Sequence, residues 1–390
     1  MSKSLNSFTF NTAASIVFEP GASKRLGVIV GRLLGQRVLF VTDPGLRRLG
    51  LCDPAIAALE ATGVDVSIFD SVEADPSHTT LLSAVETGKS ASITGVVGFG
   101  GGSSLDVAKL AALLLGSGED LDKAWGVAQA KGPRLPLVLV PTTAGTGSEV
   151  TPVSIITVGA EEKRGVSSAL ILPDIAILDP ELTLGLPPAI TAATGVDAMV
   201  HAIEAYASKS ANNNPLSKML AKEALRLLGA NIETAVNNGS DIAARSAMLL
   251  GSMLAGQAFA NSPVAAVHAL AYPIGGTFHV PHGLSNALVL PHVLRFNAPD
   301  AAQLYAEIAS DAFPHLSAEE STPSRCAAFI EELTALSSRV GLQSRLRDVG
   351  IGETALPKMA ADAMKQQRLL VNNPREVREE DALAIYRAAW

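Results

Sequence analysis

Short apolar runs alternate with helical patterns through the first half of the chain. The runs are rich in β-branched residues and occupy residues 38–42, 64–69, 95–98 and 137–140. Between them, residues 53–62 and 79–90 carry apolar side chains at helical spacing and few helix breakers. Strands that alternate with helices form parallel sheets, because each parallel connection needs a crossover. The pattern therefore predicts an α/β domain.

The pattern changes at residues 184–188, where the sequence LGLPP concentrates Gly and Pro. Beyond this point Ala, Leu and Met dominate, and apolar positions keep a helical spacing over long stretches. The clearest predicted helices cover residues 216–228, 243–259 and 324–340. We expect two domains, an α/β domain at residues 1–185 and an all-helical domain at residues 186–390.

The composition is typical of a globular protein with a large core. Hydrophobic residues make up 48% of the 390 residues, and charged residues make up only 17%. The formal net charge is −8, and no run of Lys or Arg is longer than two residues. Because binding to nucleic-acid phosphates requires a basic surface, we expect no nucleic-acid partner.

Cysteines and apolar runs bear on the cellular location. Cys52 and Cys326 lie far apart and form no CxxC pair, so neither a disulfide framework nor a cysteine zinc site is predicted. The polar N-terminus lacks the apolar segment of a signal peptide. No apolar run reaches the roughly 18–20 residues of a membrane span. We expect a cytoplasmic protein that does not bind membranes.

Two loops with phosphate-binding character follow predicted strands. Residues 98–103 read GFGGGS, and glycines of this kind let backbone N–H groups approach an anion at the start of a helix. The segment matches neither GxGxxG nor Walker A, so a purely structural turn is an alternative. Residues 141–152, PTTAGTGSEVTP, concentrate hydroxyl groups and small residues after the next strand. Together the two loops suit a dinucleotide at the carboxyl edge of a sheet.

Asp43 closes the first predicted strand. A carboxylate there can accept hydrogen bonds from an adenosine ribose and would repel a 2′-phosphate, which favours NAD over NADP. The alternative is an ordinary turn residue, because Asp-Pro-Gly is common turn chemistry. The acid precedes the glycine loop, so the order is not that of a simple Rossmann fingerprint.

Five of the seven histidines fall between residues 201 and 292. Asp197 and His201 are four residues apart, which places both on one helix face. His268, His279 and His282 surround a Pro/Gly break further along the chain. A carboxylate with several imidazoles suits Fe(II) or Zn(II) and is too rich in nitrogen for Mg or Ca. The cluster predicts a metal site, with His279 open to facing either the metal or the substrate.

A divalent metal beside a dinucleotide site is suited to hydride transfer. The ion would act as a Lewis acid on an alcohol oxygen, and the hydride would pass to the nicotinamide. Common hydrolytic chemistries are not predicted, because the sequence contains neither a GxSxG elbow nor an HExxH pair.

Together these segments resemble the iron-containing, or group III, alcohol dehydrogenase family over nearly the whole chain. Residues 372–375, NNPR, also resemble the end of the family pattern. The resemblance implies a dinucleotide-binding α/β domain and an all-helical metal-binding domain, with the active site in the cleft between them. The implied metal ligands are Asp197, His201, His268 and His282. The implied cofactor contacts are Asp43, Gly100, Gly101, Gly102, Ser103, Asp106, Thr142, Thr143, Thr146, Lys163 and Leu182.

The same resemblance implies a metal-dependent dehydrogenase that moves hydride between a small alcohol or aldehyde and NAD. Members commonly form dimers in which the N-terminal strand crosses between subunits, so residues 8–18 are expected at a homodimer interface. Tyr272 stands where several members have a second histidine, which puts a histidine proton relay in doubt. His279 is the catalytic candidate among the remaining histidines.

Two other functions compete with the dehydrogenase. Lyases resembling dehydroquinate synthase also use NAD and a metal, but they tend to line the site with Lys and Arg, whereas residues 268–282 contain neither. A metal-binding protein without turnover would leave the glycine-rich and hydroxyl-rich loops unexplained. The dehydrogenase is therefore the favoured reading.

Overall fold

The chain divides into two compact units in the computed structural model, which describes residues 7–159, 162–316 and 321–390. The sheet unit comprises residues 11–184, and the helical unit comprises residues from 185 onward. The described residues before Asn11 also group with the helical unit. They do so because Thr9 exchanges two backbone hydrogen bonds with the side chain of Asn212, each 2.9 Å long.

Within the described residues, six parallel strands form the main sheet in the order β1-β9-β6-β4-β2-β3. Their bounds are β1 (Ser15–Phe18), β2 (Arg37–Val41), β3 (Asp65–Phe69), β4 (Gly95–Gly100), β6 (Leu137–Pro141) and β9 (Ile175–Leu178). The four strands predicted from apolar runs are β2, β3, β4 and β6. Parallel pairing confirms the predicted α/β architecture.

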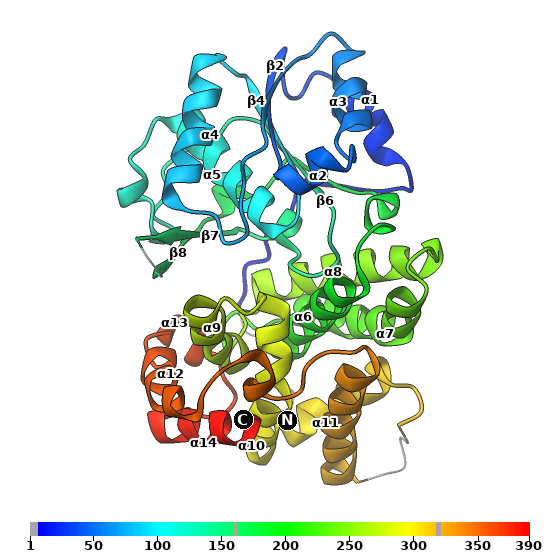
Figure 1. Cartoon of the computed structure of the whole chain (residues 1–390), viewed down its shortest axis with the longest axis vertical. Helices are drawn as coiled ribbons and strands as arrows, with labels where there is room; N and C mark the ends of the chain where they lie inside the picture. Colours follow the sequence, from blue (N-terminus) through cyan, green and yellow to red (C-terminus); the bar gives the residue numbers. More distant parts are fainter. Residues whose placement is uncertain (1–6, 160–161, 317–320) are drawn as a thin grey trace. The chain divides into compact units, whose positions relative to one another are not determined.

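Both faces of this sheet are covered by helices, as Figure 1 shows. Val38 and Phe40 of β2 point into a core shared with α1 (Leu26–Val30) and α3 (Asp53–Glu60). The alternate residues of β2 point into a second core with α4 (His78–Ser90) and α5 (Gly102–Ser117). Burial on both faces explains why these strands read as continuous apolar runs.

A smaller three-stranded sheet lies in the same unit, with the order β5-β8-β7. Its strands are β5 (Gly126–Val127), β7 (Val153–Val158) and β8 (Glu162–Ser167). The apolar pattern did not predict this sheet, because β8 reads EKRGVS and carries too few apolar residues to signal a strand. Short helices complete the unit: α2 (Pro44–Arg48), η1 (Ala22–Arg25), η2 (Leu121–Lys123), η3 (Ser148–Val150), η4 (Ala169–Ile171) and η5 (Pro180–Thr183).

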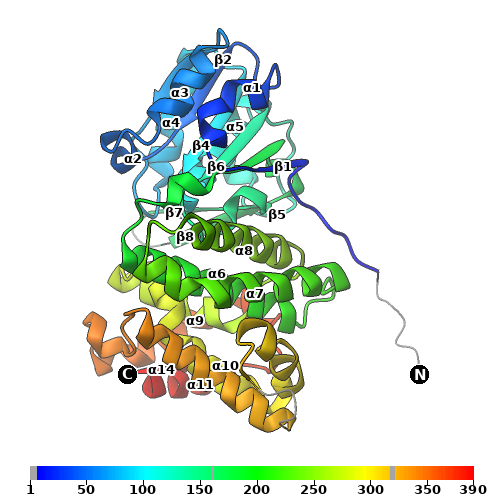
Figure 2. The same cartoon turned by 90° about the vertical axis from the view of Figure 1, so that its right-hand side faces the viewer.

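The helical unit is built around α6 (Pro188–Ala207), which packs against α7, α8 and α10 (Figure 2). The remaining helices are α7 (Pro215–Asn237), α8 (Ile242–Asn261), α9 (Ala266–Phe278), α10 (His282–Ala312), α11 (Thr322–Arg339), η6 (Leu346–Val349), η7 (Glu353–Ala355), α12 (Leu356–Ala363), α13 (Gln367–Leu370) and α14 (Glu379–Ala389). These helices confirm the predicted all-α second part. None of the described helices combines the length and apolarity needed to cross a membrane.

Candidate active site

Helix α6 carries three buried polar side chains on one face. Asp197, His201 and Glu204 follow one another at four and three residues, so they align along the helix. Their exposed fractions are 2%, 5% and 5%. Because a buried polar group is costly unless it is paired, this stripe requires partners from neighbouring helices.

Helices α9 and α10 supply those partners. His268 lies in the first turn of α9, and His282 is the first residue of α10. Gly283 permits the start of α10 to approach α6 closely, since a Cβ there would lie 2.3 Å from the carbonyl oxygen of Ala193. This close approach brings Nε2 of His282 to 3.8 Å from Oδ1 of Asp197.

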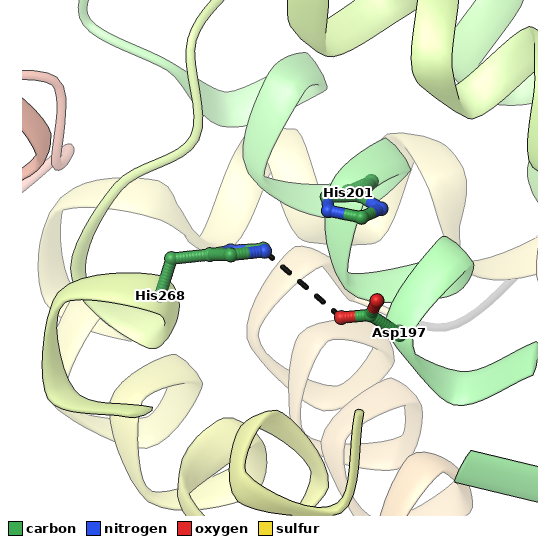
Figure 3. Close-up of side chains that lie close together, drawn as sticks. All are labelled: Asp197, His201 and His268. Carbon is green, nitrogen blue, oxygen red and sulfur yellow. Dashed lines mark ion pairs between the residues drawn. The ribbon is translucent and has the colours of Figure 1, made fainter. Parts of the chain in front are cut away.

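The side chains of Asp197, His201 and His268 lie close together (Figure 3). Nε2 of His268 lies 4.0 Å from Oδ1 of Asp197. Asp197, His201 and His268 each offer a ligand atom, and these atoms lie within 4.8 Å of one another. Two atoms that each bind one ion at about 2.0–2.2 Å are at most about 4.4 Å apart. The Asp197 separations to His268 and His282 fall inside that limit.

The polar contacts of Asn286 test whether these residues suit a cation. Its side-chain nitrogen lies 2.6 Å from Oδ1 of Asp197, 3.2 Å from Nε2 of His268 and 3.3 Å from Nε2 of His282. An amide group has two hydrogens and cannot satisfy three acceptors. Its own Oδ1 is buried without a hydrogen-bond partner in the described chain. Three converging lone pairs of nitrogen and oxygen fit a divalent metal of the Fe or Zn type.

The charge state of Asp197 also suits the binding of a divalent metal. Burial alone would raise the pKa of its carboxyl, but His201, His282, His268 and the amide of Asn286 lower that pKa below its ordinary value. The side chain is therefore an anion at neutral pH. Metal ligands must be deprotonated, so the surroundings prepare this residue for coordination.

Glu204 lies behind His268, and no sequence motif had indicated a role for it. Its Oε2 lies 2.6 Å from Nδ1 of His268, and its Oε1 accepts a 2.7 Å hydrogen bond from the backbone nitrogen of Val267. Its position seven residues after Asp197, on the same helix face, is the feature of the sequence that could have indicated this role.

His279, the predicted catalytic residue, ends α9 in a left-handed conformation with φ of 55°. Its side chain is exposed, and its ring makes no hydrogen bond or ion pair within the described part of the chain. Tyr272 is half-buried, and its ring centroid lies 6.2 Å from that of His282. The residue that departs from the family pattern therefore borders the cluster.

In the sheet unit, parallel pairing brings the predicted cofactor segments to one edge. Gly100 pairs with Pro141, and β2 lies on the other side of β4, so the loops after all three strands share the carboxyl edge. The backbone nitrogen of Thr142 donates to the carbonyl of Gly100 at 3.0 Å. The glycine-rich loop, the hydroxyl-rich loop and Asp43 therefore belong to one surface of this unit.

Helix α5 begins in the glycine-rich loop without a side-chain cap on Gly101, its N-cap residue. The first backbone N–H groups of such a 16-residue helix have no acceptor within it and favour an anion. Gly102 permits the two loops to meet, since a Cβ there would lie 2.9 Å from Cγ2 of Thr146. Ser103 and Thr143 are half-buried beside these positions. The cradle fits a phosphate group.

Asp106 and the fully buried Lys109, both on α5, hold the hydroxyl-rich loop and the start of β7 against this helix. Asp106 accepts from the hydroxyl of Ser148 at 2.7 Å and from the backbone nitrogen of Ile155 at 2.9 Å, using both carboxylate oxygens. Nζ of Lys109 donates to the same hydroxyl at 2.7 Å and to the carbonyl of Val153 at 2.7 Å. Asp106, predicted to contact the cofactor, is thus already hydrogen-bonded to the hydroxyl-rich loop and to β7.

The other predicted cofactor contacts also have partners in the protein. Oδ1 of Asp43 caps α2 by accepting from the backbone nitrogens of Gly45 and Leu46 at 2.8 and 3.0 Å. Nζ of Lys163 lies 2.7 Å from Oδ1 of Asp75. Leu182 is 7% exposed and belongs to the hydrophobic core of the sheet unit.

Comparisons with known proteins cover both units. Residues 13–180 match the family model "Iron-containing alcohol dehydrogenase", and residues 191–390 match "Fe-containing alcohol dehydrogenase family, C-terminal". Long-chain-alcohol dehydrogenase 1 of Geobacillus thermodenitrificans is 41% identical over 390 aligned positions, which cover 97% of each chain.

Two further relatives are similar over almost the whole length. Sulfoacetaldehyde reductase of Bilophila wadsworthia is 36% identical, with 98% of each chain covered. A crystal structure of 1,3-propanediol oxidoreductase superposes with a TM-score of 0.95 at 37% identity, covering 98% of this chain and 100% of the other.

Glu149, in η3 within the hydroxyl-rich loop, yields a prediction about stability and pH. Burial raises the pKa of its carboxyl to about 7, so the folded protein holds a proton there that the unfolded chain releases near pH 4. The contribution of Glu149 to the free energy of unfolding should therefore fall as pH rises from about 4 to about 7.

In the Glu149→Gln variant, the decrease in the free energy of unfolding between about pH 4 and about pH 7 should be smaller by roughly 1–3 kcal/mol than in the parent protein. Urea unfolding of both proteins at several pH values measures it, and the exposed Glu86→Gln is the matched control. Parallel pH profiles for the parent protein and Glu149→Gln would contradict the interpretation.

Proposed function

This chain belongs to the iron-containing alcohol dehydrogenase family and is an alcohol oxidoreductase, and we propose that it exchanges hydride between a small alcohol or aldehyde and NAD at a divalent metal. The observation that carries the proposal is the convergence of Asp197, His201, His268 and His282, with Glu204 behind His268. Such a constellation is unusual among otherwise apolar, buried helix faces.

The four side chains have separate tasks in this proposal. Asp197 provides the single anionic ligand, and the imidazoles of His201, His268 and His282 provide neutral ones. A divalent ion held by them would keep a net positive charge and supply Lewis acidity toward the substrate oxygen. Phe259 stacks on His201 with 4.3 Å between ring centroids and helps to hold the imidazole in place.

The cofactor assignment is NAD, with the phosphates at the start of α5. The uncapped helix terminus and the contact between Gly102 and Thr146 support this position. Asp43 supports NAD over NADP because its carboxylate would repel a 2′-phosphate. Its second carboxylate oxygen is not used in capping α2.

The class of relatives also bears on the alternatives. The matched proteins carry the names of alcohol dehydrogenases and aldehyde reductases, which favours a dehydrogenase over a lyase resembling dehydroquinate synthase. Their named substrates range from long-chain alcohols to 1,3-propanediol and sulfoacetaldehyde. We therefore propose these three classes, together with short primary alcohols, as the first substrates to assay.

Removing a ligand should remove the metal and the activity while leaving the fold. In His268→Ala and His282→Ala, elemental analysis is expected to show metal content well below one ion per chain. NADH formation from the alcohols and NADH oxidation by sulfoacetaldehyde should both be lost. His282 is the safer site, because its side chain is 44% exposed and its truncation leaves no core cavity.

The exposed His315→Ala is the matched control and should retain metal and turnover. Circular dichroism checks the fold of every variant. Full metal occupancy in both ligand variants would overturn the assignment of the site.

Cofactor preference should change when the charge of Asp43 is removed. Asp43→Asn retains an oxygen that can cap α2 and loses the negative charge, so the kcat/KM ratio of NADP to NAD should rise about tenfold or more. Asp65→Asn, at the opposite end of the parallel strands, removes an equal charge and should leave the ratio unchanged. An unchanged ratio in Asp43→Asn would count against the ribose contact.

We further propose that the protein is a homodimer formed along the N-terminal segment. Strand β1 lies at the edge of the main sheet, and Phe8 and Phe18 are 40% and 39% exposed. An edge strand that carries an exposed apolar residue such as Phe18, and a second exposed apolar residue in the segment before it, favour association with a second copy. Analytical ultracentrifugation of the full chain should show a dimer, and deletion of residues 1–12 should shift it toward the monomer. A monomer at micromolar concentration would refute the proposal.

A further inference from the structure

We propose that Glu204 is a positioning residue for the metal centre, which holds His268 in the tautomer that directs the Nε2 lone pair toward the ion. The inference rests on the proposed metal-dependent function. It adds a residue that does not touch the ion itself and acts only through His268.

The hydrogen bonds of Glu204 leave it little freedom. Oε2 lies 2.6 Å from Nδ1 of His268, Oε1 accepts from the nitrogen of Val267 at 2.7 Å, and both partners are buried. Val267 lies in the first turn of α9, where backbone N–H groups have no acceptor within the helix. The positive end of the helix dipole favours a negative charge at this position.

This arrangement determines where the imidazole proton lies. A carboxylate only accepts hydrogen bonds, so at 2.6 Å the facing Nδ1 must carry the hydrogen. The opposite tautomer would place two lone pairs against each other. With the proton on Nδ1, the lone pair of Nε2 points toward Asp197 and the amide of Asn286, where the donor atoms converge.

Replacement of Glu204 by glutamine disturbs the hydrogen bonds that fix the tautomer of His268, and it leaves the side-chain volume nearly unchanged. If the amide oxygen accepts from Val267, the amide NH₂ faces Nδ1 of His268 and favours the tautomer with hydrogen on Nε2. If the amide is turned over, its NH₂ faces the N–H of Val267 and one hydrogen bond is lost. Either orientation weakens the presentation of His268 to a metal.

The test is the metal dissociation constant, measured by competition with a chromophoric chelator for Zn(II) and Co(II). Glu204→Gln should bind each metal about 10–100-fold more weakly than the parent protein. Glu307→Gln is the matched control, because Glu307 accepts a 2.7 Å hydrogen bond from Tyr206 in the same unit and lies outside the cluster. Its dissociation constant should not change.

A purely structural role for Glu204 gives a different result. In that case Glu204→Gln lowers the melting temperature of the metal-free protein but binds metal like the parent, and this outcome would overturn the proposal. A parent protein that binds neither metal would instead overturn the proposed metal centre.

A second measurement does not depend on the folding of Glu204→Gln. In the metal-free parent protein, histidine ¹⁵N NMR should show a downfield Nδ1–H resonance that disappears in His268→Ala. A resonance pattern for His268 with hydrogen on Nε2 would also overturn the proposal.

Discussion

The pairing of a buried polar stripe on α6 is the constraint on which the helical unit depends. Asp197, His201 and Glu204 lie among apolar residues, where unpaired carboxylates and imidazoles would be costly. Helices α9 and α10 satisfy this demand by placing His268, His282 and Asn286 against the stripe. The same contacts therefore serve two purposes: they pair the buried polar groups, and they assemble the candidate metal ligands.

In the sheet unit, the order of the strands brings the predicted cofactor loops together. Adjacent parallel strands end at one edge, so loops that are distant in sequence become neighbours without direct attraction between them. Asp106 and Lys109 then join α5, which follows the glycine-rich loop, to Ser148 of the hydroxyl-rich loop and to the backbone of β7. Burial lowers the pKa of the Lys109 ammonium, and its four oxygen neighbours offset that cost.

The structure gives several of the predicted site residues partners within the protein itself. Asp106 and Lys163 both form polar contacts within the sheet unit, and Leu182 packs into its core. His279 has an exposed ring at a helix end, whereas the buried Glu204 directly contacts His268. Motif position shows that a residue lies near a site, but the direction of the side chain decides which atom it serves.

Local patterns by themselves determined the two-part architecture, the four central strands and the Asp197/His201 pair, because helical and strand periodicities act over a few residues. They also marked the glycine-rich and hydroxyl-rich loops. Only the tertiary structure decided that Asn286 lies among the donor atoms, that Glu204 contacts His268, and that Lys109 links α5 to the hydroxyl-rich loop. Those contacts join residues that are 18 to 89 positions apart in the sequence. Local periodicity acts over a few residues and therefore does not encode them.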